Sequence, residues 1–208
     1  MFKWTAIRDH FRQMSRYIGL GTIIFLAGII IGGINPAFRQ FLDGQLEGLD
    51  QLVRGIENST NPTLTMLLVI FFNNAIKAVL IMYFGALLGI LPIVFLVVNG
   101  MVLGYMMQLN AEKYGAMQTV ELMIKGILPH GWIEIPAIII ASAYGIRFGV
   151  IMLKLLGSGL FARSKAAANV KSLEYFLIRS VPVTVLLIVA LAVAAVIEST
   201  VTGWILGK

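Results

Sequence analysis

Five stretches of apolar side chains, each about long enough to cross a bilayer, constrain this fold more than any other feature. A helix needs roughly 20 apolar residues to cross the hydrocarbon core. The 208-residue chain is 59% hydrophobic and only 12% charged, which excludes an ordinary soluble domain. The sequence therefore predicts an all-α fold, a polytopic bundle of five transmembrane helices that forms a single membrane domain over residues 1–208. The expected spans are 17–34, 63–87, 89–109, 132–156 and 175–197.

Two polar connections carry periodic apolar residues and are expected to hold short helices outside the spans. Between residues 38 and 57 the apolar side chains recur at spacings of three and four, which predicts an amphipathic helix on the membrane surface or on one end of the bundle. Residues 120–128 predict a second short helix, interfacial or re-entrant, that cannot cross the bilayer by itself. The turn between the second and third spans is expected between Gly85 and Pro92.

Basic residues are distributed unequally between the two ends of this topology. Nine lysines and arginines fall on the side of the N-terminus and five on the other. The acidic residues divide the opposite way, with two on the side of the N-terminus and seven on the other. By the positive-inside rule, the protein is a multi-pass protein of the cell membrane with its N-terminus in the cytoplasm and its C-terminus outside. The basic residues that give the net charge of +6 lie where membrane topology and anionic lipid headgroups account for them. The lipid bilayer is therefore the expected partner, and nucleic acid is not.

Charged and amide side chains inside apolar spans mark the place to seek a site, because each is costly in hydrocarbon. His130 and Glu134 lie four residues apart at the start of the fourth span, and one helical face therefore carries both. We expect Glu134 to meet the polar face of the second span, with Lys77 or an asparagine as its partner. The candidate intramembrane polar site consists of His130, Glu134, Asn73, Asn74, Lys77 and Asn99.

Arg147 is not expected to belong to this site. It follows Glu134 by 13 residues, which places it on roughly the opposite helical face and about 20 Å further along. Its side chain should instead extend towards the cytoplasmic end of the bundle.

The polar residues admit two interpretations. They form a site for a substrate, a proton or a lipid headgroup, or they form interhelical hydrogen bonds that hold the bundle together. No metal ion is expected, because His130 and Glu134 are only two ligands and His10 is predicted at the other end. No cofactor motif is present, cysteine is absent, and no nucleophile stands beside a base. The sequence therefore does not predict an enzyme.

Glycines recur at spacings of four and are expected to bring helices into close contact. These pairs line contacts within one bundle or, alternatively, form the face of a homodimer. The eight helix-packing glycines are Gly28, Gly32, Gly85, Gly89, Gly100, Gly104, Gly145 and Gly149.

Several short motifs on the second, third and fourth spans resemble one known family. They are an asparagine pair, an Asn-Gly followed by a further glycine, and a Leu-Pro-His-Gly corner followed by Glu-Ile-Pro-Ala. This pattern resembles the stage II sporulation protein M family of bacterial and archaeal membrane proteins over nearly the whole chain. The residues that carry the resemblance are Asn73, Asn74, Asn99, Gly100, Gly104, Leu128–Gly131, Glu134–Ala137, Ala141 and Gly145.

The resemblance implies a membrane protein without a known enzymatic reaction. The sporulation member acts in forespore engulfment, where it is thought to anchor peptidoglycan-degrading partners at the septal membrane. The corner with a glutamate after it is the pattern of the broader family, which occurs in organisms that do not sporulate. The expected function is a membrane scaffold for cell-envelope partners that remodel peptidoglycan. The alternative is a transporter or lipid-handling protein with a polar site around His130 and Glu134.

Overall fold

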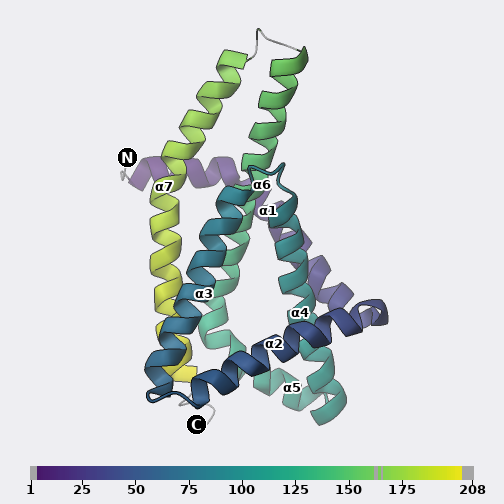
Figure 1. Cartoon of the computed structure of the whole chain (residues 1–208). Helices are drawn as coiled ribbons and strands as arrows, with labels where there is room; N and C mark the ends of the chain where they lie inside the picture. The colour runs from purple at the N-terminus through teal and green to yellow at the C-terminus, as the bar shows by residue number, and fades with distance from the viewer. Residues whose placement is uncertain (1–3, 162–163, 165, 203–208) are drawn as a thin grey trace.

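The computed structural model describes residues 4–161, 164 and 166–202, which are helical apart from short turns (Figure 1). Five of the described helices are long and apolar enough to cross a membrane, which confirms the predicted all-α membrane bundle. They are α1 (Trp4–Ile34), α3 (Pro62–Phe84), α4 (Ile90–Tyr114), α6 (Leu128–Phe161) and α7 (Ala166–Ile197).

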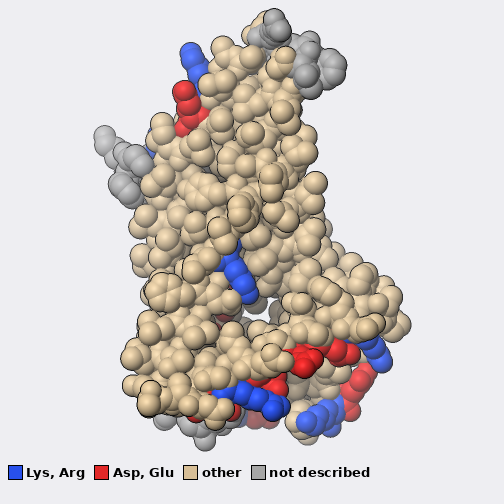
Figure 2. Space-filling model, in the orientation of Figure 1, with Lys and Arg blue, Asp and Glu red and all other residues tan. Residues whose placement is uncertain are grey.

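The two ends of the bundle differ in what covers them. At the α2 end lie the helices α2 (Arg39–Glu57) and α5 (Ala116–Leu122), together with η4 (Glu198–Thr202), a π-helical continuation of α7. At the opposite end, the hairpin end, α6 and α7 extend well past the turn between α3 and α4 (Figure 1). Charged side chains gather over the α2 end, and the middle of the visible face is almost entirely uncharged (Figure 2). This distribution is that of a bundle whose middle lies in lipid.

Helices α6 and α7 are longer than the spans predicted for them. The predicted bounds follow the apolar runs, but α7 begins earlier and includes polar residues such as Lys171 and Glu174 before its apolar run. Helix α1 also starts earlier, with a segment that lies across α6 and α7 before the helix turns to run along α4 (Figure 1). Hydropathy therefore located the spans but not the ends of the helices.

Local sequence signals set the start of α3 and the turn after it. Asn61 accepts a hydrogen bond from the Leu64 amide at 3.1 Å, and Pro62 occupies the first helical turn. After Phe84 the chain turns through residues 85–89, inside the segment where the turn was predicted. Leu88 and Gly89 both have positive φ angles, of 60° and 75°, and glycine adopts such angles without steric cost.

The predicted amphipathic helix is α2, which follows the short 3₁₀ helix η1 (Pro36–Phe38). Leu42 of α2 is fully buried against Met101 and Tyr105 of α4. The Tyr105 hydroxyl donates a 2.6 Å hydrogen bond to Asp43. One apolar contact and one hydrogen bond thus fix the first half of α2 across the end of α4.

The second short helix differs from the prediction. It starts at Ala116, four residues before the predicted segment, and it does not end before the fourth span. Instead, the π-helical segment η2 (Met123–Ile127) joins α5 to α6 without a non-helical residue. Pro129 lies inside this continuous run, two residues after the π-helical segment, and it cannot donate a backbone hydrogen bond there because proline has no N–H.

All eight predicted packing glycines lie at close contacts within the chain. A Cβ added to Gly28 or Gly32 would meet the backbone of α4, and one added to Gly104 would meet the backbone of Ile29. At a second contact, Gly85 faces Gly145, and Gly89 faces Gly149. We call the contacts of α1 with α4 and of the turn 85–89 with α6 the two glycine contacts. A homodimer would need another surface, because the bundle itself uses these glycines.

Replacing Gly104 with alanine should destabilise the bundle, because the added methyl group overlaps the backbone of Ile29. The expected loss is about 1–3 kcal/mol in the free energy of unfolding, measured by denaturant titration in detergent. Gly19→Ala is the matched control, since nothing lies within 4 Å of a Cβ at that position of α1. Equal stability of the two variants would contradict the close approach of α1 and α4.

Candidate functional site

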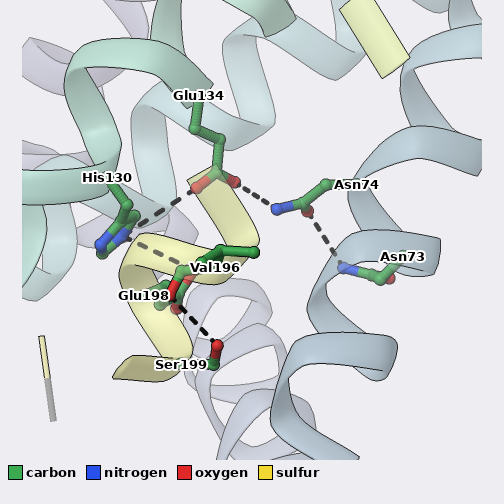
Figure 3. A network of polar contacts seen from close by, with 7 residues as sticks. All are labelled: Asn73, Asn74, His130, Glu134, Val196, Glu198 and Ser199. Atoms are coloured by element: carbon green, nitrogen blue, oxygen red, sulfur yellow. Dashed lines mark hydrogen bonds and ion pairs between the residues drawn. The ribbon is translucent and has the colours of Figure 1, made fainter. Parts of the chain in front are cut away.

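Three helical segments bring five polar side chains together at the α2 end (Figure 3). Asn73 and Asn74 come from α3, His130 and Glu134 from the first turns of α6, and Glu198 from the start of η4. Helices α3 and α6 pack against each other, and η4 contacts both of them. The site therefore depends on the packing of the whole bundle, since it joins residues from distant parts of the chain.

The two oxygens of Glu134 have different partners. Oε1 accepts a hydrogen bond from the Asn74 amide at 2.8 Å, and Asn74 Oδ1 in turn accepts one from Asn73 at 3.3 Å. Oε2 instead faces the imidazole, 3.9 Å from His130 Nε2. The Asn73–Asn74 pair thus orients the Glu134 carboxylate, with one oxygen held by α3 and the other directed at His130 (Figure 3).

Glu198 lies near the same imidazole nitrogen of His130. Its Oε2 lies 3.8 Å from His130 Nε2. One ligand-type atom from each of the three residues lies within 4.8 Å of the other two. We call His130, Glu134 and Glu198 the His–Glu–Glu cluster.

The cluster is largely but not completely enclosed by protein. The exposed fractions of the side chains are 12% for His130, 20% for Glu134 and 23% for Glu198. Two carboxylates this close repel each other strongly when water is mostly excluded. A proton, a protonated histidine or a bound cation would offset that repulsion.

Two of the predicted site residues lie outside the cluster. Asn99 donates its side-chain hydrogen bond to the Phe95 carbonyl of its own helix at 2.7 Å. Lys77 is exposed, and within the described residues it forms no ion pair with Glu134, although its charge acts on that carboxylate. Of the two partners predicted for Glu134, the structure places the asparagine in direct contact.

Arg147 is separated from the cluster, as its position along α6 predicted. It donates a hydrogen bond to the sulfur of Met14 on α1 at 3.1 Å, and its guanidinium lies 5.8 Å from the centre of the Phe176 ring. Both partners lie towards the hairpin end, where the side chain was expected to extend.

Glu198 was missed by reasoning from the sequence. A signal was present, because Glu198 follows the apolar run that ends at Ile197, and a five-span topology puts that point at the same end as His130. The sequence could not show that η4 turns towards α6, since that depends on how α7 packs.

The cluster supplies a set of ligands for a metal ion. Zinc bound to imidazole and carboxylate has ligand distances of about 2.0–2.2 Å. A tetrahedral site of that size separates its ligand atoms by about 3.5 Å. The 3.8–3.9 Å spacings from His130 to the two glutamates are close to this value, and all three ligand atoms, which lie within 4.8 Å of one another, would have to move closer to hold the ion. The expectation of no metal rested on two ligands, and Glu198 supplies a third.

Ser199 adds no nucleophile to this arrangement. Its hydroxyl donates a 3.2 Å hydrogen bond to the Val196 carbonyl of its own helix (Figure 3). The imidazole and the two carboxylates of the cluster can bind a cation or a proton.

Comparison with known proteins agrees with the resemblance seen in the motifs. The family described as stage II sporulation protein M matches residues 21–203, which includes the two glycine contacts and the whole cluster. The chain belongs to this family. An uncharacterized protein of Methanocaldococcus jannaschii, MJ0706, is 26% identical over 193 residues, which is 92% of this chain and 82% of that protein. No solved structure matches.

The hydrogen bond between Asn74 and Glu134 should couple α3 to α6 energetically. In a double-mutant cycle of Asn74→Ala and Glu134→Ala, we expect the two losses of unfolding free energy to be non-additive by about 0.5–3 kcal/mol. Denaturant titration of the four proteins in detergent measures this term. Repeating the cycle with Asn99→Ala in place of Asn74→Ala is the control, because Asn99 bonds only to its own helix. Additive losses in the first cycle would show that the 2.8 Å contact does not stabilise the fold.

Proposed function

We propose that this protein is a non-enzymatic membrane transport protein whose His–Glu–Glu cluster binds a divalent transition-metal ion. One observation carries the proposal: an imidazole nitrogen and two carboxylate oxygens from α6 and η4 converge within 4.8 Å inside a largely apolar membrane bundle. Ionisable residues inside a membrane domain are costly, and they commonly mark the path of an ion or substrate.

The contacts around the cluster support a metal site. Ligand side chains are usually oriented by further hydrogen bonds, which hold them ready for the ion. Here Asn74 binds Glu134 Oε1 and leaves Oε2 directed at His130, and Asn73 supports Asn74. Such a chain of amides fixes the direction of the ligand oxygen before any ion arrives.

Access to the cluster is from the α2 end. Towards the hairpin end, the core between α3, α6 and α7 is closed by buried apolar side chains, including Ala78, Ala141 and Leu191. The excess of basic residues at the hairpin end supports a cytoplasmic location for that end and for the N-terminus. The proposed ion then enters from outside the cell, and the apolar core must separate for it to pass.

The ligand types narrow the choice of ion. Imidazole suits zinc, iron, nickel and copper, and carboxylates suit manganese and magnesium. A mixed set of one imidazole and two carboxylates favours Zn²⁺ and Mn²⁺ over Mg²⁺, which prefers six oxygen ligands.

Purified protein in detergent should bind about one Zn²⁺ or Mn²⁺ per chain, measured by equilibrium dialysis and elemental analysis. Glu134→Gln and Glu198→Gln should each weaken this binding by at least tenfold, because each removes one of three ligands. Glu121→Gln is the matched control, because that exposed carboxylate pairs with Lys125 on the neighbouring turn, outside the cluster. Liposomes that contain the wild-type protein should then take up the metal ion that the protein binds, and liposomes that contain Glu198→Gln should not.

The binding and uptake measurements separate the two parts of the proposal. Equal binding by the wild type and both cluster variants would exclude the metal site. Binding that depends on the cluster, without uptake by liposomes, would retain the site and exclude transport.

A second candidate function is a scaffold for peptidoglycan-remodelling proteins of the cell envelope. The observation that favours it is the outer surface of α2, where Phe41, Leu49 and Val53 remain 46–47% exposed beside charged residues. The first half of the helix is fixed to α4 and Ile56 near its end is buried, while the exposed side of the helix presents apolar and charged side chains together. Such mixed surfaces are common at protein interfaces.

The scaffold function requires that α2 faces the outside of the cell. A cysteine in place of Leu49, in a chain that has no other cysteine, should be labelled in intact cells by a membrane-impermeant thiol reagent. A photo-crosslinker at the same position should capture an envelope protein, and a crosslinker at Ile76 of α3 should capture none. Labelling only after lysis would contradict the orientation, and identical capture from both positions would contradict the scaffold.

A further inference from the structure

A second polar site lies at the hairpin end, far from the His–Glu–Glu cluster. It is a cavity of about 580 Å³ between α1, α6 and α7. Among the side chains that line it are Tyr17, Arg147, Lys154, Asn169, Lys171 and Ser172. We call this cavity the basic pocket.

The charge of the basic pocket is entirely positive. Arg147, Lys154 and Lys171 line it, and none of its lining residues is acidic. Three cations around one cavity attract an anion, and the attraction is screened least at Arg147, which is only partly exposed, whereas Lys154 and Lys171 are exposed. Asn169, Ser172 and Tyr17 add neutral groups that can donate hydrogen bonds to such an anion.

Arg147 is held in place without an anionic partner among the described residues. A guanidinium carries five N–H donors, and the side-chain acceptor that Arg147 reaches is the weakly accepting sulfur of Met14, at 3.1 Å. Its guanidinium carbon also lies 5.8 Å from the centre of the Phe176 ring, within the range of a cation–π contact. Arg147 is only partly exposed, and a charge in such a place requires compensation.

The helices around the pocket are also tied to each other. The Asn169 amide at the start of α7 donates a 3.1 Å hydrogen bond to the Lys154 carbonyl of α6. This bond joins the backbone of α6 at Lys154 to the start of α7, and the first segment of α1 crosses these two helices (Figure 1). Tyr17 and Tyr175 line the pocket, and tyrosines are enriched where a membrane meets water.

We propose that the basic pocket binds a phosphate group. Guanidinium and ammonium groups are the usual protein partners of phosphate, and basic pockets between transmembrane helices bind lipid headgroups. The phosphate belongs either to an anionic phospholipid of the surrounding membrane or to a small soluble molecule. This site is independent of metal binding, because the cluster lies at the other end of the bundle.

The test uses purified, delipidated protein in detergent with two probes, phosphatidylglycerol and inorganic phosphate, and with phosphatidylcholine as the zwitterionic reference. Bound lipid is measured by native mass spectrometry, and phosphate by its effect on the melting temperature. Arg147→Gln should weaken binding of the favoured probe about tenfold, since one charged hydrogen-bond donor group is lost. Lys125→Gln is the control, because Lys125 lies at the α2 end and pairs with Glu121.

The double variant Lys154→Gln, Lys171→Gln tests the same pocket without altering Arg147, in case that residue is needed for folding. Selective binding of phosphatidylglycerol that both pocket variants lose identifies a lipid site. A rise in melting temperature with inorganic phosphate, lost in the same variants, identifies a soluble phosphorylated ligand. If neither probe binds, or if the pocket variants bind as the wild type does, the proposal is wrong.

Discussion

The bundle depends on the close approach of backbones at the two glycine contacts. In lipid, apolar side chains gain little from leaving their surroundings, so helices associate through packing at short range. Gly28 and Gly32 bring α1 against α4, and Gly145 and Gly149 bring α6 against the turn after α3. The second contact joins α6 to the turn that follows α3, and these are the two helices that carry Glu134 and Asn74.

The two ends of the molecule have opposite chemistry. At the α2 end, two glutamates and a histidine converge and require a positive partner. At the hairpin end, an arginine and two lysines surround a cavity and require a negative one. Apolar residues such as Ala141 and Leu191 separate these regions. The proposed cation site and the proposed anion site thus lie at opposite ends of the bundle.

Much of the fold follows from the sequence, because bilayer thickness sets a length that apolar runs must match. The same signal cannot give helix ends, since α7 begins at Ala166 and passes through Lys171 and Glu174 before its apolar run starts. Periodicity put His130 and Glu134 on one face, and the cost of a buried carboxylate pointed to a partner on α3. Glu198 could not be assigned in this way, because its position depends on the packing of η4 against α6.

The continuous helix from α5 through η2 into α6 has a mechanical consequence. A π-helical turn holds one residue more than an α-helical turn, and such turns can move along a helix. If η2 shifted past a residue, that residue would rotate by about 100° around the axis. The last residue of η2 stands three positions before His130. A change in this π-helical turn would therefore alter the direction in which one of the three cluster side chains points.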